Sequence, residues 1–127
     1  MLNKIKSNLQ NTRSIGNKGE LIALNYFKSL GYTLLQKNWR VLKMEIDMIL
    51  SFQENIVFVE VKYRENRYYK MAELLSISQE KRLVEAMDIY IRDNEINCEP
   101  RFDLIFVTNQ YGINKIYHFP SYIQPTL

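Results

Sequence analysis

Residues 44–63 read MEIDMILSFQENIVFVEVKY. Two β-rich runs, 46–50 and 56–63, flank a short polar break at 53–55, and this pattern predicts a β-hairpin. Because side chains alternate between the two faces of a strand, Asp47, Glu60 and Lys62 can meet on one face of the hairpin. The opposite face is expected to pack into a core, and its members are apolar: Ile46, Met48, Leu50, Val57, Val59, Val61 and Tyr63.

The charged side chains of this hairpin need a partner, because ionised groups in so apolar a strand are costly unless paired or bound to a metal. One interpretation is a salt bridge, in which Lys62 neutralises Glu60 or Asp47 on a solvated face. The other is a metal site, since two carboxylates from adjacent strands suit a hard divalent cation such as Mg²⁺. Lys62 beside that cation can orient or deprotonate an attacking water, or neutralise charge on a phosphate. The second interpretation predicts metal-assisted phosphodiester hydrolysis.

The composition is typical of one soluble globular domain. The chain has 127 residues, of which 46% are hydrophobic and 24% charged, and this length suffices to bury a core. We expect no membrane span, because no apolar run is long enough, and the first residues lack the apolar region of a secretory signal. A single cysteine, Cys98, excludes an internal disulfide and indicates a reducing cytoplasm. The net charge of +3 permits nucleic acid as a partner without requiring it.

Helix and strand patterns flank the hairpin on both sides. After an N-terminal arm of residues 1–14, capping residues precede a helix predicted over residues 18–30, which Gly31 ends. A first strand is predicted over residues 32–40. The run Ser76-Ile77-Ser78-Gln79 has the form of a capping box and begins a second helix that reaches about residue 94. One or two further strands, over 101–108 and 113–119, complete an α/β (α+β) domain whose mixed sheet is flanked by helices.

Glu20 is a further candidate for the acidic face. It lies on the apolar side of the first predicted helix, three and four residues before Ala23 and Leu24. A carboxylate near a helix N-terminus is stabilised by the helix dipole, which is one explanation for it. The other is that Glu20 reaches Asp47 and Glu60, and its inward position favours this second explanation.

Basic residues follow the hairpin. Residues 62–70 contain four basic side chains, one acidic side chain and three tyrosines, which suits phosphate contact and stacking on unpaired bases, although a solvated loop is the competing interpretation. Two cations in the first turns of the second helix oppose its dipole, which favours another purpose for them. The candidate nucleic-acid contacts are Arg40, Arg64, Arg67, Lys70, Lys81 and Arg82. Asp103 and His118 are interpreted as structural, with Asp103 pairing Arg101 or a basic helix residue.

Several motifs together resemble a known family. They are Gly16-Asn17-Lys18-Gly19-Glu20, Asn38-Trp39-Arg40, Glu45-Ile46-Asp47-Met48-Ile49, Val57–Arg64 and Arg101–Ile105. Their order, with Glu on the first helix, Asp on the second strand and Glu-x-Lys on the third, resembles the PD-(D/E)XK nuclease superfamily and its restriction-endonuclease-like core. More narrowly, they resemble the YraN-type family of bacterial proteins, which are predicted endonucleases related to archaeal Holliday junction resolvases.

The resemblance implies a single nuclease-like domain over residues 1–127 that uses Mg²⁺ or Mn²⁺ to cut branched or double-stranded DNA. Asp47, Glu60 and the backbone carbonyl of Val61 would bind the metal. Lys62 would position or activate the water, and Glu20 would complete the acidic cluster. A homodimer would cut both strands of a junction by symmetry. Family members have a glycine where this chain has a methionine, at position 44, and usually another after the Glu-x-Lys strand, so these turns are made differently here.

Two other functions stay open from the residues alone. A non-catalytic nucleic-acid-binding module on a nuclease-like scaffold would bind DNA in a salt-dependent manner but would bind no metal. A protein-interaction domain with a buried ion-pair network would bind no DNA, and it would tolerate Lys62→Met. Both use the same fold as the enzyme, because a fold does not by itself establish a function.

Overall fold

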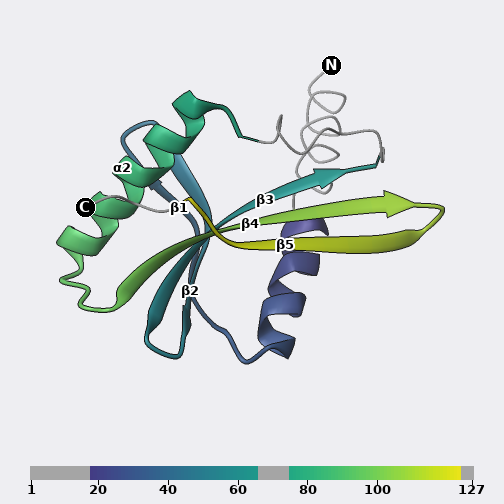
Figure 1. Cartoon of the computed structure of the whole chain (residues 1–127), viewed down its shortest axis with the longest axis horizontal. Coiled ribbons are helices and arrows are strands. Elements are labelled where there is room, and N and C mark those ends of the chain that lie inside the picture. The colour runs from purple at the N-terminus through teal and green to yellow at the C-terminus, as the bar shows by residue number, and fades with distance from the viewer. Residues whose placement is uncertain (1–17, 66–74, 124–127) are drawn as a thin grey trace, which may run out of the picture.

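The computed structural model describes residues 18–65 and 75–123 of the chain (Figure 1). A helix over residues 18–29, called here the N-terminal helix, comes first. The elements that follow are β1 (Thr33–Val41), β2 (Met44–Phe52), β3 (Asn55–Arg64), α2 (Ile77–Asp93), β4 (Glu99–Gln110) and β5 (Ile113–Ile123). This order confirms the predicted arrangement of a mixed α+β domain. The N-terminal arm, Arg67 and Lys70 lie outside the described residues.

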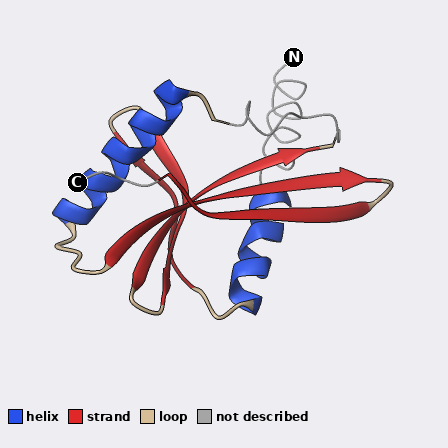
Figure 2. Ribbon diagram, viewed as in Figure 1, coloured by secondary structure: helices blue, strands red, loops and turns tan. Residues whose placement is uncertain are grey.

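The five strands form one mixed sheet in the order β1-β2-β3-β4-β5. Only β3 and β4 are parallel, and every other neighbouring pair is antiparallel. A parallel pair needs a crossover connection, which α2 supplies. The two helices lie at different parts of the sheet (Figure 2), and each packs on a different face of it.

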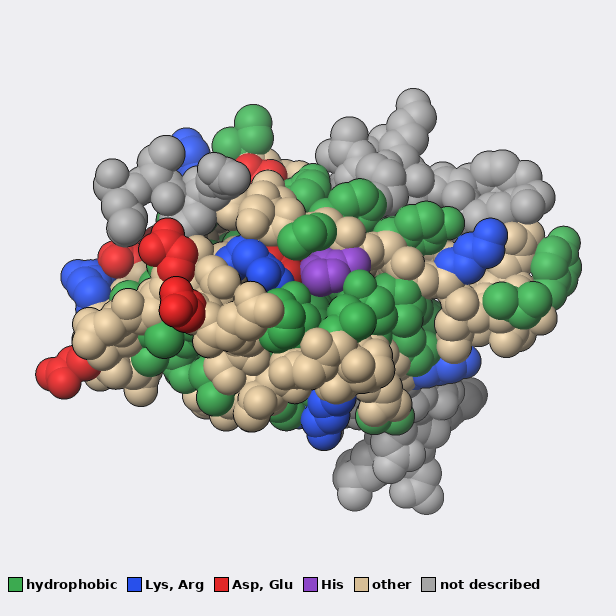
Figure 3. Space-filling model, turned by 60° about the horizontal axis from the view of Figure 1, so that its bottom comes forward, with side chains coloured by type: hydrophobic (Ala, Val, Ile, Leu, Met, Phe, Trp, Pro, Cys, Tyr) green, Lys and Arg blue, Asp and Glu red, His purple; other side chains and the backbone are tan. Residues whose placement is uncertain are grey.

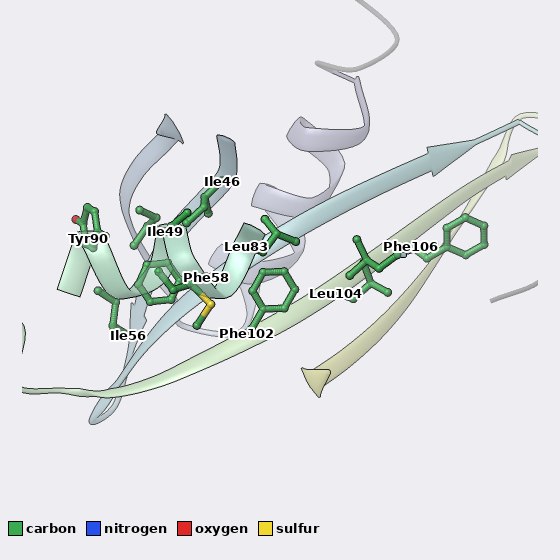
Figure 4. Close-up of a cluster of buried hydrophobic side chains, with 12 residues drawn as sticks. Ile46, Ile49, Ile56, Phe58, Leu83, Tyr90, Phe102, Leu104 and Phe106 are labelled. Atoms are coloured by element: carbon green, nitrogen blue, oxygen red, sulfur yellow. The ribbon is translucent and has the colours of Figure 1, made fainter. Parts of the chain in front are cut away.

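Both faces of the sheet carry a core, where the sequence predicted one. The side chains of α2 pack with Ile49, Phe58, Phe102 and Leu104 (Figure 4). Those of the N-terminal helix pack on the other face with Met48, Leu50, Val57, Val59, Ile105 and Val107. The acidic face of the hairpin is therefore not solvated along its length, because Ile49 and Phe58 on that face are fully buried.

One residue departs from the predicted division of faces in β2. Ile46 was placed with Met48 and Leu50, but it packs in the α2-side core with Ile49. At this point β2 loses its pairing with β3 but stays paired with β1, where Ile46 lies opposite Trp39. The ladder with β3 begins only at Met48, and the β1 residue Asn38, opposite Asp47, has a φ of 50°. Because β2 is released from β3 here and its β1 partner is irregular at Asn38, the side chains no longer alternate regularly and Ile46 turns toward α2.

The predicted helix ends are confirmed in detail. The side chain of Ser76 accepts a hydrogen bond from Gln79 N at 3.1 Å, and Ser76 N donates to Gln79 Oε1 at 3.0 Å. These two bonds are a capping box. At the end of the N-terminal helix, Gly31 has a φ of 91°, and Tyr32 N donates to Phe27 O at 3.0 Å. Glycine adopts this left-handed conformation at the least cost, which is why it ends the helix.

Two details of the strands differ from the expectation. Strand β5 does not end near residue 119 but continues through Pro120 to Ile123, because proline is tolerated in an outer strand whose N–H groups need no ladder partner. The tight turn between β1 and β2 needs no glycine at Met44, since the positive φ, 56°, falls on Leu42. Within the described ranges, no helix is both long and apolar enough to span a bilayer.

Candidate active site

Asp47 lies at the point where β2 and β3 separate. Regular pairing between the two strands stops at Met48 and Val59. Beyond that point, Val61 N of β3 donates a hydrogen bond to Asp47 Oδ2 at 2.8 Å. The carboxylate thus replaces a backbone carbonyl in the ladder, which fixes it between the two strands. The amide of Val61 is used in this way, and a role for its carbonyl in metal binding stays a prediction.

Glu60 and Lys62 follow on the same face of β3. Lys62 Nζ lies 3.2 Å from Glu60 Oε1, and each side chain is 16% exposed. The carboxyl group of Glu60 also lies close enough to that of Asp47 for its charge to raise the pKa of Asp47. The structure therefore brings together three of the four predicted catalytic side chains.

Glu20 approaches from the N-terminal helix through an intermediary. With its amide oriented to satisfy both partners, Asn38 Nδ2 donates to Glu20 Oε1 and to Glu45 Oε1, each at 3.1 Å. The close packing of the helix on β3 depends on Gly19, since a Cβ there would lie 2.8 Å from Tyr63 Cβ. Glu20 is thus held at the edge of the acidic cluster, next to Glu45.

Asn38 is a site residue to which the sequence assigned no role. Its φ of 50° lies in the left-handed region, which asparagine adopts more readily than most residues. The available signal was an asparagine inside an otherwise regular strand pattern. Glu45 was placed on the face of Asp47, but its link to Glu20 was not foreseen.

Burial and mutual repulsion raise the pKa values of these carboxyl groups. Burial, followed by the charge of Glu60, raises the pKa of Asp47 to about 8, although the hydrogen bond from Val61 N opposes the shift. Burial also raises the pKa of Glu60, against the opposing effect of Lys62. The pKa of Glu20 is raised in the same way, mainly by burial. The cluster thus contains more carboxyl groups than one lysine can neutralise, and a further cation would favour their ionised forms.

The donor set fits a hard divalent cation only in part. Among the described residues, no group of three or more His, Cys, Asp or Glu side chains is arranged to hold a metal ion. The pair of Asp47 and Glu60 offers oxygen ligands alone, which Mg²⁺ and Mn²⁺ prefer, and Mg²⁺ commonly binds through one or two carboxylates and several waters. These two side chains are therefore the ones that would hold such an ion.

An open cleft of about 170 Å³ adjoins the carboxylate pair. Its lining comes from the β1–β2 turn, the start of β2, β3, α2 and the segment just before α2, and consists of Lys43, Met44, Glu45, Glu60, Leu75, Gln79, Arg82 and Leu83. Among the predicted nucleic-acid contacts that the structure describes, Arg82 alone lines this cleft. It is exposed and bonds only weakly to Ser78, at 3.4 Å.

The other described basic candidates do not line the cleft. Arg40 has a side chain that is 78% exposed, and its Nε is 3.5 Å from Glu45 Oε2. Arg64 donates to Tyr63 O at 2.8 Å. Lys81 is exposed on α2. Arg67 and Lys70 lie outside the described residues, so their predicted contacts stay predictions.

A second polar cluster lies on the face that the N-terminal helix covers. Asp103 is fully buried and accepts two hydrogen bonds from Arg101, at 2.8 and 2.9 Å, which confirms the predicted pairing. His118 Nε2 lies 2.6 Å from Asp103 Oδ2, and its Nδ1 lies 2.9 Å from Tyr26 Oη. The ring reaches the surface among apolar side chains (Figure 3, purple). Sequence reasoning missed this contact, because Asp103 and His118 are brought together only by the pairing of β4 with β5.

The sequence of the chain is similar to those of other proteins. Residues 19–107 match the profile of a family described as uncharacterised protein family UPF0102. The chain belongs to the UPF0102 family. A UPF0102 protein of Clostridioides difficile is 38% identical over 99 residues, which are 76% of this chain and 87% of the relative. A UPF0102 protein of Bacteroides thetaiotaomicron is 32% identical over 114 residues, 89% of this chain and 94% of the relative. One of Shewanella sediminis is 41% identical over 93 residues, 72% of this chain and 80% of the relative.

The UPF0102 match confirms the family resemblance that the motifs indicated. The matched region, residues 19–107, begins next to Glu20 and includes Asp47, Glu60 and Lys62. It ends within β4, so β5 and its histidine lie beyond it. The acidic cluster and its cleft thus belong to the part of the chain that defines it as a UPF0102 protein.

Proposed function

We propose that this UPF0102 protein is a metal-dependent endonuclease that hydrolyses phosphodiester bonds in DNA. One observation carries the proposal: two largely buried carboxyl groups, Asp47 and Glu60, lie close together where β2 and β3 separate, with Lys62 Nζ 3.2 Å from Glu60 Oε1. The stability of the fold does not require this pair of carboxyl groups, because two adjacent carboxylates with raised pKa values cost free energy when no metal is bound. Groups perturbed in this way are typical of functional sites.

Each residue of the site has a different role in the proposed hydrolysis. Mg²⁺ or Mn²⁺ held by Asp47 and Glu60 would supply a Lewis acid and a water of lowered pKa. Lys62 donates hydrogen bonds and, from its place beside Glu60, orients the attacking water and balances charge on the phosphate. The carbonyl of Val61 and the side chain of Glu20 complete the proposed ligand set. Arg82, at the cleft, contacts a backbone phosphate.

Cleavage by matched variants tests this function. Wild type, Asp47→Asn and Asp88→Asn are incubated with Mn²⁺ or Mg²⁺ and with linear, nicked and four-way-junction DNA. Asp88 is an exposed α2 residue paired with Arg92, so its variant makes the same chemical change outside the site. We expect metal-dependent cutting by wild type and Asp88→Asn, and a loss of at least about 100-fold in Asp47→Asn. Equal cutting by all three, or no cutting of any DNA by a folded wild type, overturns the proposal.

A second function is favoured by a different observation. Lys62 already compensates Glu60 without a metal, and the described carboxylates form no three-ligand group. A DNA-binding module that uses the fold without hydrolysis would have this property. It predicts salt-dependent DNA binding together with no calorimetric uptake of Mn²⁺ by wild type.

A further inference from the structure

The cleft beside the carboxylate pair has an apolar part and a polar part. Met44, Leu75 and Leu83 supply the apolar lining, and Leu75 and Leu83 are themselves almost fully buried. Lys43, Gln79 and Arg82 supply hydrogen-bond donors. Glu60 lines the same cleft, so whatever occupies it lies directly beside the proposed site of hydrolysis.

The size of the cleft selects a small, flat group. Its volume is about 170 Å³, and an apolar cavity of roughly 150 Å³ holds one benzene ring. A single nucleobase fits such a space, whereas a base pair does not. Sites that recognise an unstacked base combine apolar contact with its faces and hydrogen bonds to its edge.

The charges around the cleft fix the orientation of a nucleotide within it. Glu60, whose side chain is only 16% exposed, lines the cleft and would repel a phosphate there. Arg82 and Lys43 are exposed, so they can meet a phosphate outside the cleft. Gln79 Oε1 accepts from Ser76 N, and the Nε2 donors of Gln79 have no partner among the described residues. A base inside and a phosphate outside satisfy both sets of groups.

We propose that this cleft receives one unpaired nucleobase of the DNA substrate, next to the phosphate that is cut. The inference rests on the proposed nuclease function and names its substrate class. The bases of an intact duplex are stacked and paired, so filling the cleft from a duplex requires unstacking, at a cost of a few kcal/mol. A flap, gap or junction offers an unpaired base without that cost. The cleft therefore selects DNA with an unpaired nucleotide at the cutting position.

Fluorescence of 2-aminopurine tests the cleft without hydrolysis. The probe is placed in a one-nucleotide bulge or, as a control, opposite thymine in an otherwise identical duplex, and full-length protein is added in EDTA. This base is quenched by stacking on other bases, and the described cleft lining has no aromatic side chain. We therefore expect brighter emission on binding for the bulged probe, little change for the paired one, and about tenfold tighter binding of the bulged DNA.

Two tryptophan substitutions provide the matched comparison. Met44→Trp places a large ring at the partly exposed cleft entrance, and Leu35→Trp places it on exposed β1, outside the cleft. Met44→Trp is expected to abolish the fluorescence response and the preference for bulged DNA, while Leu35→Trp retains both. Circular dichroism establishes that each variant is folded. If Met44→Trp unfolds, Gln79→Ala replaces it, with an expected loss of about tenfold in affinity for bulged DNA alone.

The outcomes separate this inference from the proposed function. Equal responses of bulged and paired probes, equal behaviour of the two variants, or no binding of either DNA overturns the cleft assignment. Cleavage of intact duplex at the same rate as gapped DNA overturns it as well, but leaves the nuclease proposal standing. A correct fluorescence response without any metal-dependent cutting removes the nuclease proposal and retains a site for an unpaired base.

Discussion

Asp47 of β2 accepts a hydrogen bond from the backbone N–H of Val61 in β3, and this side chain stands where a ladder carbonyl would otherwise be. The bond joins the two halves of the hairpin while it holds a carboxyl group in a buried position. The same residue is thus part of the sheet and of the candidate site. Substitution at Asp47 therefore affects both stability and chemistry, and the two effects have opposite signs.

Asp47→Asn is expected to stabilise the metal-free protein at alkaline pH. The pKa of Asp47 is raised from 3.8 to about 8. The folded state therefore holds a proton that the unfolded chain has lost. The stability that this proton contributes is fully present below pH 3.8 and is lost as the pH rises through about 8. Asparagine can accept from Val61 N without a charge, so at pH 9 the variant should have a free energy of unfolding about 1–3 kcal/mol higher.

Urea unfolding from pH 5 to 9 in EDTA measures this difference. The wild-type free energy should decline with pH more steeply than that of the variant. Asp88→Asn, on exposed α2, should follow wild type throughout. A variant less stable than wild type at pH 9 would show that the carboxylate is more favourable in the fold than its burial implies.

Metal binding should release protons from the carboxyl pair. A cation at Asp47 and Glu60 requires their ionised forms, but both pKa values are raised. Affinity for Mn²⁺ should therefore increase up to about tenfold per pH unit as the pH approaches 8. Calorimetry at one pH in two buffers of different ionisation enthalpy counts the released protons. Identical heats in the two buffers would contradict proton release, and Asp47→Asn should show no binding at all.

Gly19→Ala is expected to destabilise the fold, against the usual preference of helices for alanine. Alanine in a helix interior is normally better than glycine by about 1 kcal/mol. Here its Cβ would meet Tyr63 Cβ at 2.8 Å, so the helix must move off β3. We expect a net loss of about 1–3 kcal/mol in urea unfolding. Lys28→Ala, on the exposed side of the same helix, is the control, and an equal or higher stability of Gly19→Ala would show that the helix shifts freely.

Asp103→Asn should be destabilising at neutral pH. Burial alone would raise the pKa of Asp103, but hydrogen bonds from His118, Arg101 and Ser121 N outweigh it and hold the pKa below its ordinary value. The stability this contributes is present above the unfolded pKa of 3.8 and is lost as the pH falls through the lower folded value. The variant leaves Arg101, whose side chain is 18% exposed, without its counter-charge.

We expect Asp103→Asn to lower the free energy of unfolding by about 3–5 kcal/mol at pH 7, which is the cost of breaking a buried ion pair. Thermal unfolding at pH 7 and at pH 3 measures it, and the difference from wild type should shrink at the lower pH. An unchanged difference at both values would indicate that the packing of the side chain, and not its charge, is what matters. Glu99→Gln, at the exposed start of β4, is the matched control.

The helices and strands were predicted from local sequence patterns. The contacts that were not predicted depend on how strands distant in the sequence pair with one another. The capping box at Ser76 and the helix end at Gly31 depend on neighbouring residues, and both were predicted. The bond from Val61 N to Asp47 depends on where the β2–β3 ladder stops, which no residue type specifies. The contact of His118 with Asp103 depends on the register in which β5 pairs with β4. Alternation predicted that Asp47, Glu60 and Lys62 share a face, but it could not reveal that Ile49 and Phe58 on that face are buried under α2.

The outer strands of the described sheet bear on how copies of this protein meet. On one edge, β1 has a register shift between Leu34 and Gln36 and a left-handed residue at Asn38. On the other, β5 contains Pro120 and a positive φ at Ser121. A long unbroken edge is a template for aggregation, and interruptions of this kind remove it. In a chain that is 46% hydrophobic, these interruptions disfavour edge-to-edge stacking of the described sheet into fibrils, and we expect contacts between copies to be made by side chains.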